Sequence, residues 1–223
     1  MTDGERSSID DVIDVYKRNV DRTLIRERLA RSIEERLEDL MELQRASPRN
    51  CDERDDATPR PLTDFESLLR ALTEGGVEFI LVGGATATVH GWSRDVDVVY
   101  RRARENITRL AAALTAYQPY LGGAPPGLPF RWDVPTIEHG LNFTLTTQLG
   151  DLNVLGEIVG GGGYDALLAS TSLIRAFDVE CRCLNLDRLI EVKRAAGRPK
   201  DLEALAELEA IRDEGPAEPE RES

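Results

Sequence analysis

The first 46 residues carry hydrophobic positions at the spacing of amphipathic helices. Apolar residues recur three or four positions apart among many charged ones, which is the pattern of helices that bury one narrow face. Ser32-Ile33-Glu34-Glu35 has the form of a capping box, so a helix is predicted from Ile33 to Ala46, before Pro48. We therefore predict an N-terminal helical appendage over residues 1–47. Its apolar stripes would pack on a partner helix, on a second copy of the chain or on the main domain.

A different pattern follows. Residues 48–61 lack apolar periodicity and contain three prolines, as is typical of a linker. From residue 62 to residue 213, short apolar runs alternate with longer amphipathic segments, which favours an α/β (α+β) domain. The predicted strands are residues 78–82, 95–100, 142–148, 151–155, 173–177 and 179–184, and the predicted helices are residues 64–74, 104–117, 164–170, 186–196 and 201–212. The first of these helices should begin at a second capping box, Thr63-Asp64-Phe65-Glu66. Residues 214–223 are predicted to be a disordered acidic tail.

Charge and composition exclude two classes of protein. The 223 residues include 41 acidic and 28 basic side chains, a net charge of −13, whereas a protein that coats nucleic acid over a wide face needs a positive surface. Hydrophobic residues make up 41% of the chain, enough for one sizeable core but too little for a membrane protein.

The N-terminal sequence lacks the pattern of a signal peptide, and glycines interrupt the longest apolar stretch, so we expect a cytoplasmic protein. Cys51, Cys181 and Cys183, with only two histidines in the chain, make no convincing zinc site. We predict that the three cysteines are reduced thiols.

Asp95-Val96-Asp97 is the most informative run for chemistry. Side chains two residues apart on a strand point to the same face, so both carboxylates would converge on one small volume. Two such charges about 5 Å apart repel by about 3 kcal/mol at an effective dielectric constant of ~20. A Mg²⁺ ion offsets that repulsion and shares its remaining positions with substrate phosphates. The alternative is an exposed edge strand whose acids face water.

A glycine pair lies ten residues before this run. Gly83 and Gly84 come directly after a predicted strand, where the missing side chains let phosphate oxygens approach backbone N–H groups. The pair fits neither the P-loop pattern nor the dinucleotide-binding fingerprint.

Together these motifs resemble a known family. Val82-Gly83-Gly84-Ala85, His90-Gly91, Ser93-Arg94-Asp95-Val96-Asp97 and the stretch from Lys193 to Leu202 are similar to the minimal nucleotidyltransferase-like proteins of the DNA polymerase beta superfamily. Many members of that group are similar to toxins of toxin–antitoxin or abortive-infection modules. The resemblance spans residues 63–212 and implies a nucleotidyltransferase fold, with a small mixed sheet and helices mainly on one side.

The resemblance also implies an activity: transfer of a nucleoside monophosphate from a nucleoside triphosphate such as ATP to a hydroxyl on an RNA or tRNA end or on a protein. Two Mg²⁺ ions held by three carboxylates would support it. Asp95 and Asp97 match the first two acids. The position of the third is occupied by Asn153, and Asp151 lies two residues earlier on the same predicted face. Asparagine can ligate a metal through its carbonyl oxygen, but it can neither act as a base nor neutralise charge.

The resemblance therefore implies that Asp95, Asp97 and Asp151 are catalytic, with Asn153 as a further metal ligand. It implies nucleotide contacts from Gly83, Gly84, Ser93 and Lys193. Lysine usage is a separate hint, because Lys193 is one of only three lysines in an arginine-rich chain.

Two further hypotheses stay open. An arginine patch (Arg101, Arg102, Arg104 and Arg109) would engage a tRNA end. The rival to the enzyme is a catalytically degenerate module that binds a nucleotide or a protein partner, with the N-terminal helices carrying the interaction or self-association.

Overall fold

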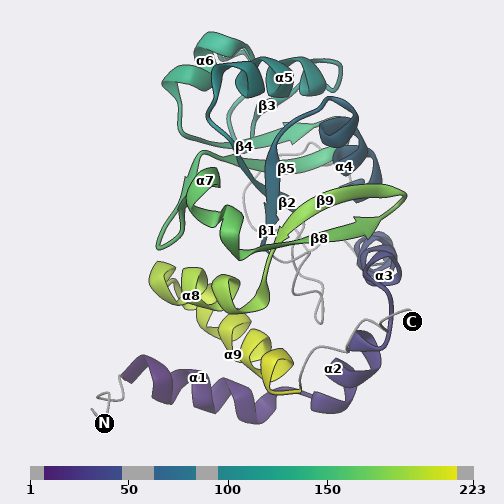
Figure 1. The fold of residues 1–223 in the computed structure, drawn as a ribbon, viewed down its shortest axis with the longest axis vertical. Helices are drawn as coiled ribbons and strands as arrows, with labels where there is room; N and C mark the ends of the chain where they lie inside the picture. Colours follow the sequence, from purple (N-terminus) through teal and green to yellow (C-terminus); the bar gives the residue numbers. More distant parts are fainter. Residues whose placement is uncertain (1–7, 47–62, 84–94, 215–223) are drawn as a thin grey trace.

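The computed structural model describes residues 8–46, 63–83 and 95–214 (Figure 1). The predicted linker, residues 48–61, and residues 215–223 of the predicted tail lie outside the described residues, as do Cys51, Gly84 and Ser93.

A mixed sheet forms the centre of the described structure, as predicted (Figure 1). Seven strands lie in the order β3-β4-β5-β2-β1-β9-β8; β2 pairs with β5 and β1 with β9 in parallel, and the other neighbours are antiparallel. Their bounds are β1 Phe79–Val82, β2 Asp95–Tyr100, β3 Tyr120–Leu121, β4 Asn142–Thr147, β5 Gly150–Leu155, β8 Thr171–Ala176 and β9 Val179–Leu184. A separate short ladder joins β6 (Glu157–Ile158) to β7 (Gly162–Gly163).

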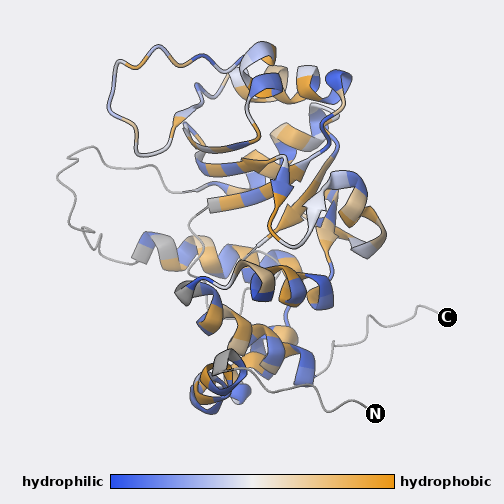
Figure 2. Cartoon of the chain, turned by 90° about the vertical axis from the view of Figure 1, so that its left-hand side faces the viewer, coloured by the Kyte–Doolittle hydropathy of each residue, from blue (hydrophilic) through white to orange (hydrophobic). Residues whose placement is uncertain are grey.

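Helices cover both faces of this sheet, which corrects the expectation that they lie mainly on one side. One face packs against α3 (Ile33–Ala46), α4 (Phe65–Glu74), α5 (Arg104–Thr115) and α6 (Val134–His139). The other packs against α7 (Tyr164–Leu167), α8 (Leu186–Ala196) and α9 (Pro199–Glu214), and α1 (Ser8–Asn19) packs on α9. All four residues of β1 are buried, and a strand that is apolar on both faces must be covered on both. Figure 2 shows the helices with hydrophobic and hydrophilic residues interleaved, as expected of amphipathic helices.

The structure confirms one of the two predicted capping boxes and corrects the other. At the start of α3, the Ser32 hydroxyl accepts a hydrogen bond from the Glu35 N–H (3.1 Å) and the Glu35 carboxylate accepts one from the Ser32 N–H (2.7 Å), which confirms the box. The hydrogen bond from the Ser32 N–H lowers the pKa of the Glu35 carboxyl. At the start of α4, the prediction is wrong by one residue: Asp64 caps the helix by accepting from the Ser67 N–H (3.0 Å). The hydroxyl of Thr63 instead accepts a hydrogen bond from Asp151 N–H (3.3 Å).

The N-terminal helices pack on the chain itself. Buried Ile13 of α1 joins the core formed with α8 and α9, and buried Ile25 of α2 (Arg22–Leu29) packs on Ala210 and Ile211 of α9. Figure 1 shows α1 and α2 beside the C-terminal helix α9. No helix in the described parts of the chain is long and apolar enough to cross a membrane. Cys181 and Cys183 are buried, and burial raises the pKa of the Cys181 thiol to about 12.

Ion pairs reinforce the contact between α1 and α9, and one carboxylate lies at their centre. Glu209 is 6% exposed and pairs with Lys17 (3.2 Å) and with Arg194. We expect Glu209→Gln to lower the free energy of unfolding by about 1–3 kcal/mol, because two cations lose a buried charged partner. Urea unfolding at pH 7 measures this change.

Glu207→Gln is the matched control on the same helix. Burial and then the nearby charge of Glu203 raise the pKa of Glu207. A carboxyl whose folded pKa lies above its unfolded value favours folding most at low pH and loses that contribution as the pH rises. The neutral glutamine should therefore cost no stability at pH 7. Equal destabilisation by the two substitutions would contradict a specific role for Glu209.

Candidate functional site

Asp97 lies in the middle of the sheet, where three strands meet. It pairs in register with Val82 on β1 and with Asn153 on β5. The Asn153 side-chain amide donates a hydrogen bond from Nδ2 to Asp97 Oδ1 at 2.8 Å. The position that the resemblance assigns to a third acid therefore faces Asp97 directly, and it supplies a donor there instead of a negative charge.

Gly83 lies against the same carboxylate. Its φ of +94° favours glycine, and a Cβ at this position would lie 3.1 Å from Asp97 Cγ and closer still to Asp97 Oδ2. A side chain at residue 83 would therefore collide with Asp97. The structure brings the first glycine of the predicted phosphate-binding pair next to a predicted metal ligand, while Gly84 and Ser93 lie outside the described residues.

Asp95 and Asp151 lie directly opposite each other on the parallel strands β2 and β5. Residues two apart on a strand share a face of the sheet, so Asp151 lies on the face that carries Asn153. The hydroxyl of Thr146 on β4 donates a hydrogen bond to Asp151 Oδ1 (2.7 Å). The sequence pattern did not identify this threonine, because its contact depends on the pairing of β4 with β5.

Lys193 lies on α8, whose Val192 belongs to the same buried cluster as Val82 of β1. The Lys193 ammonium is paired with Asp201 Oδ1 at 3.3 Å, and the second oxygen of Asp201 is buried without a hydrogen-bond partner among the described residues. A phosphate contact from Lys193 would therefore compete with Asp201. Asp201 lies within the stretch from Lys193 to Leu202, but the sequence pattern assigned it no role.

The side-chain oxygens on this face suit one mode of Mg²⁺ binding. Among the described residues no group of three or more His, Cys, Asp or Glu side chains is close enough to hold a metal. Asp97 and Asp151 nevertheless provide two carboxylates on one face, and Asn153 provides an amide oxygen. Such a set suits an ion that takes one or two protein carboxylates and completes its coordination with water and substrate phosphates.

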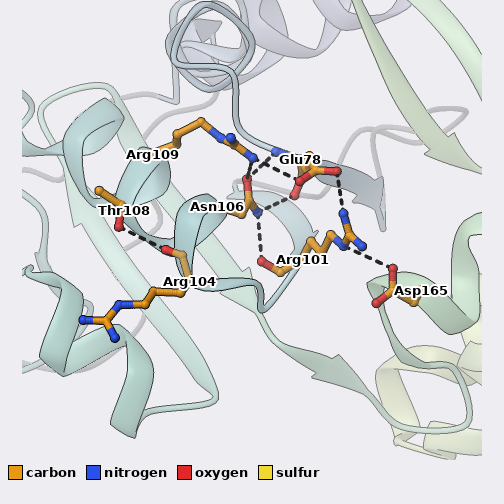
Figure 3. A network of polar contacts seen from close by, with 7 residues as sticks. All are labelled: Glu78, Arg101, Arg104, Asn106, Thr108, Arg109 and Asp165. Carbon is orange, nitrogen blue, oxygen red and sulfur yellow. Dashed lines mark hydrogen bonds and ion pairs between the residues drawn. The ribbon is translucent and has the colours of Figure 1, made fainter.

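The arginine patch is largely engaged in contacts within the chain (Figure 3). Arg101 and Arg109 both pair with Glu78 (3.1 and 3.0 Å), and Arg101 also pairs with Asp165 (3.3 Å). Arg102 donates hydrogen bonds to the Tyr100 hydroxyl and to the carbonyls of Glu138 and Gly140. Arg104 is 3.8 Å from Glu138. These guanidinium groups therefore join β1, α5, α6 and α7 to one another.

Comparison with protein-family models found no family that matches this chain, and comparison with curated proteins found no match either. The candidate site accordingly rests on the residues themselves: Gly83 against Asp97, the Asn153–Asp97 hydrogen bond, and Asp151 opposite Asp95.

Proposed function

We propose that the chain is a metal-dependent nucleotidyltransferase, which transfers a nucleoside monophosphate from a nucleoside triphosphate to a hydroxyl on an RNA end or a protein. The observation that carries the proposal is the contact of Gly83 with the Asp97 carboxylate. The first glycine of the predicted phosphate-binding pair and an acid that can hold a cation lie side by side there, an arrangement that suits binding of a metal–triphosphate complex.

In this proposal each residue has a separate role. Asp95, Asp97 and Asp151 hold Mg²⁺, and Gly83 lets a phosphate oxygen approach the backbone. Lys193 leaves Asp201 to contact the triphosphate. Mg²⁺ supplies charge neutralisation of the triphosphate and a lowered pKa for the acceptor hydroxyl. The acceptor oxygen forms a bond to the α-phosphorus as the bond to pyrophosphate breaks, and the hydroxyl proton passes to solvent.

A second candidate is favoured by the hydrogen bond from Asn153 to Asp97. That amide already satisfies one oxygen of the carboxylate and adds no negative charge, so the site holds fewer anionic ligands than three acids would give. A module of this kind would bind a nucleotide or a protein partner without turnover, as one half of a toxin–antitoxin-like pair.

Calorimetric titration with each of the four nucleoside triphosphates, in the presence of Mg²⁺, tests both candidates. We expect the wild type to bind at least one triphosphate and the Asp95→Ala/Asp97→Ala variant to bind it more than about 10-fold more weakly, because ligands of the metal are lost. Asp165→Ala/Asp178→Ala is the matched control, since it removes two exposed carboxylates elsewhere on the molecule.

No triphosphate binding by the wild type would contradict the proposed function. An equal loss of binding in the control variant would show that the substitutions act through the net charge of the protein and not through the site. A triphosphate labelled at the α-phosphate then separates the two candidates. Label transferred to an RNA or protein supports the enzyme, whereas binding without transfer supports the module.

A further inference from the structure

Two residues of β5 are candidates for a metal ligand of the proposed site. Asn153 lies opposite Asp97 and Asp151 lies opposite Asp95. Of the two, only aspartate brings a negative charge, so the question is whether the structure holds Asp151 in a fixed orientation on this face.

The side chain of Asp151 is held by Thr146. These residues are directly paired between β4 and β5, and Thr146 Oγ1 lies 2.7 Å from Asp151 Oδ1. A hydroxyl has a single proton to donate, so this bond engages one carboxylate oxygen and orients the other. Both side chains are half-buried, so water screens the bond only partly.

The backbone of Asp151 is anchored as well. Its N–H donates to the Thr63 hydroxyl (3.3 Å), and the N–H of Asp64 donates to the Leu149 carbonyl (2.8 Å). Gly150 between them has a φ of +110°, and a Cβ there would lie 2.7 Å from Thr63 Oγ1. The turn before Asp151 is therefore pressed against the start of α4, which fixes where β5 begins.

We propose that Thr146 is a positioning residue for Asp151, and that Asp151, held in this way, supplies the carboxylate that Asn153 lacks to a divalent cation bound also by Asp97. The proposal rests on the metal site of the proposed function. It predicts that metal affinity depends on the Thr146 hydroxyl, although Thr146 itself does not touch the metal.

The test measures Mn²⁺ binding by the full chain, from the electron paramagnetic resonance signal of free Mn²⁺. Thr146→Val keeps the shape and removes the hydroxyl, so we expect roughly 10-fold weaker binding, the usual loss when a residue that orients a ligand is removed. Thr146→Ser restores the hydroxyl and should restore binding. Thr144→Val is the matched control, because Thr144 lies two residues away on the same strand and is opposite Asn153.

The site comparison uses Asp151→Asn and Asn153→Ala, of which Asp151→Asn should weaken Mn²⁺ binding more. Three results would overturn the proposal and leave the proposed function standing. They are wild-type Mn²⁺ affinity in Thr146→Val, a loss of affinity in Thr144→Val equal to that in Thr146→Val, or a larger loss in Asn153→Ala than in Asp151→Asn. A wild type that binds no Mn²⁺, with or without a triphosphate, would overturn the metal site itself and this proposal with it. Thermal unfolding of each variant separates loss of the site from loss of the fold.

Discussion

An Asn153→Asp variant is expected to bind Mg²⁺ or Mn²⁺ at least about 10-fold more tightly than the wild type, and to be less stable than the wild type without metal. Asn153 Nδ2 now donates to Asp97 Oδ1 at 2.8 Å. The substitution replaces that donor with a second carboxylate oxygen. Two unit charges about 4 Å apart repel by roughly 4 kcal/mol at an effective dielectric constant of 20. A divalent cation removes the repulsion and gains a ligand.

Without metal, part of the repulsion is relieved by movement of the two side chains and by uptake of a proton. We therefore expect the free energy of unfolding of Asn153→Asp to fall by about 1–3 kcal/mol, within the usual range for a lost hydrogen bond and an unfavourable charge. Addition of Mn²⁺ should raise the midpoint of thermal unfolding of Asn153→Asp more than that of the wild type, because a ligand stabilises the folded state by an amount that increases with the logarithm of its affinity.

Asn185→Asp is the matched control. It makes the same chemical change at the N-cap of α8, where Asn185 accepts a hydrogen bond from the Arg188 N–H, and aspartate caps helices equally well. An Asn153→Asp variant with the stability and the metal affinity of the wild type would show that residue 153 lies outside the site. Nucleotidyl transfer that appears only in Asn153→Asp would support the degenerate module, whereas transfer by both proteins would support the enzyme.

Local sequence patterns predicted the elements of the fold well, because their causes are local. The strand Asp95–Tyr100 and the helices Ile33–Ala46 and Leu186–Ala196 have the predicted bounds. Both helices are delimited by residues nearby in the chain: a capping box for α3, and the Asn185 cap with Gly197 at a φ of +60° for α8. The arrangement of helices about the sheet was predicted less well, since it depends on which strands become neighbours.

The candidate site also combines features with local causes, which the sequence predicts, and features that depend on which strands are neighbours, which it does not. The proximity of Asp95 to Asp97 follows from strand geometry alone, and the glycine pair follows from its place after a strand. The partners of Asp151 cannot be predicted from local sequence, because Thr146 comes from a neighbouring strand and Thr63 from a segment 88 residues earlier in the chain. The strand order brings the Thr146 hydroxyl to the Asp151 carboxylate, and the packing of the segment before α4 on β5 brings the Thr63 hydroxyl to the Asp151 N–H. An isolated threonine in a sequence gives no signal of either role.

Asn106→Leu is expected to lower the free energy of unfolding by about 2–4 kcal/mol. Asn106 on α5 is fully buried, and its amide joins three segments: its oxygen accepts from the Glu78 N–H (2.7 Å), and its nitrogen donates to the carbonyls of Glu78 and Arg101 (both 2.9 Å), as Figure 3 shows. Leucine has a similar volume but leaves these backbone groups buried and unpaired, and each such group costs about 1–3 kcal/mol.

Urea unfolding at pH 7 measures this effect, and Thr108→Ala is the control. Thr108 is exposed on the same helix, and its hydroxyl donates to the Arg104 carbonyl of the preceding turn, so its loss should change stability by less than about 0.5 kcal/mol. The network around Glu78 adjoins the start of β1, whereas Gly83 follows the end of that strand. Below its unfolding transition, Asn106→Leu should therefore bind Mn²⁺ as the wild type does. A stable Asn106→Leu protein with reduced Mn²⁺ affinity would instead mean that the two ends of β1 are coupled.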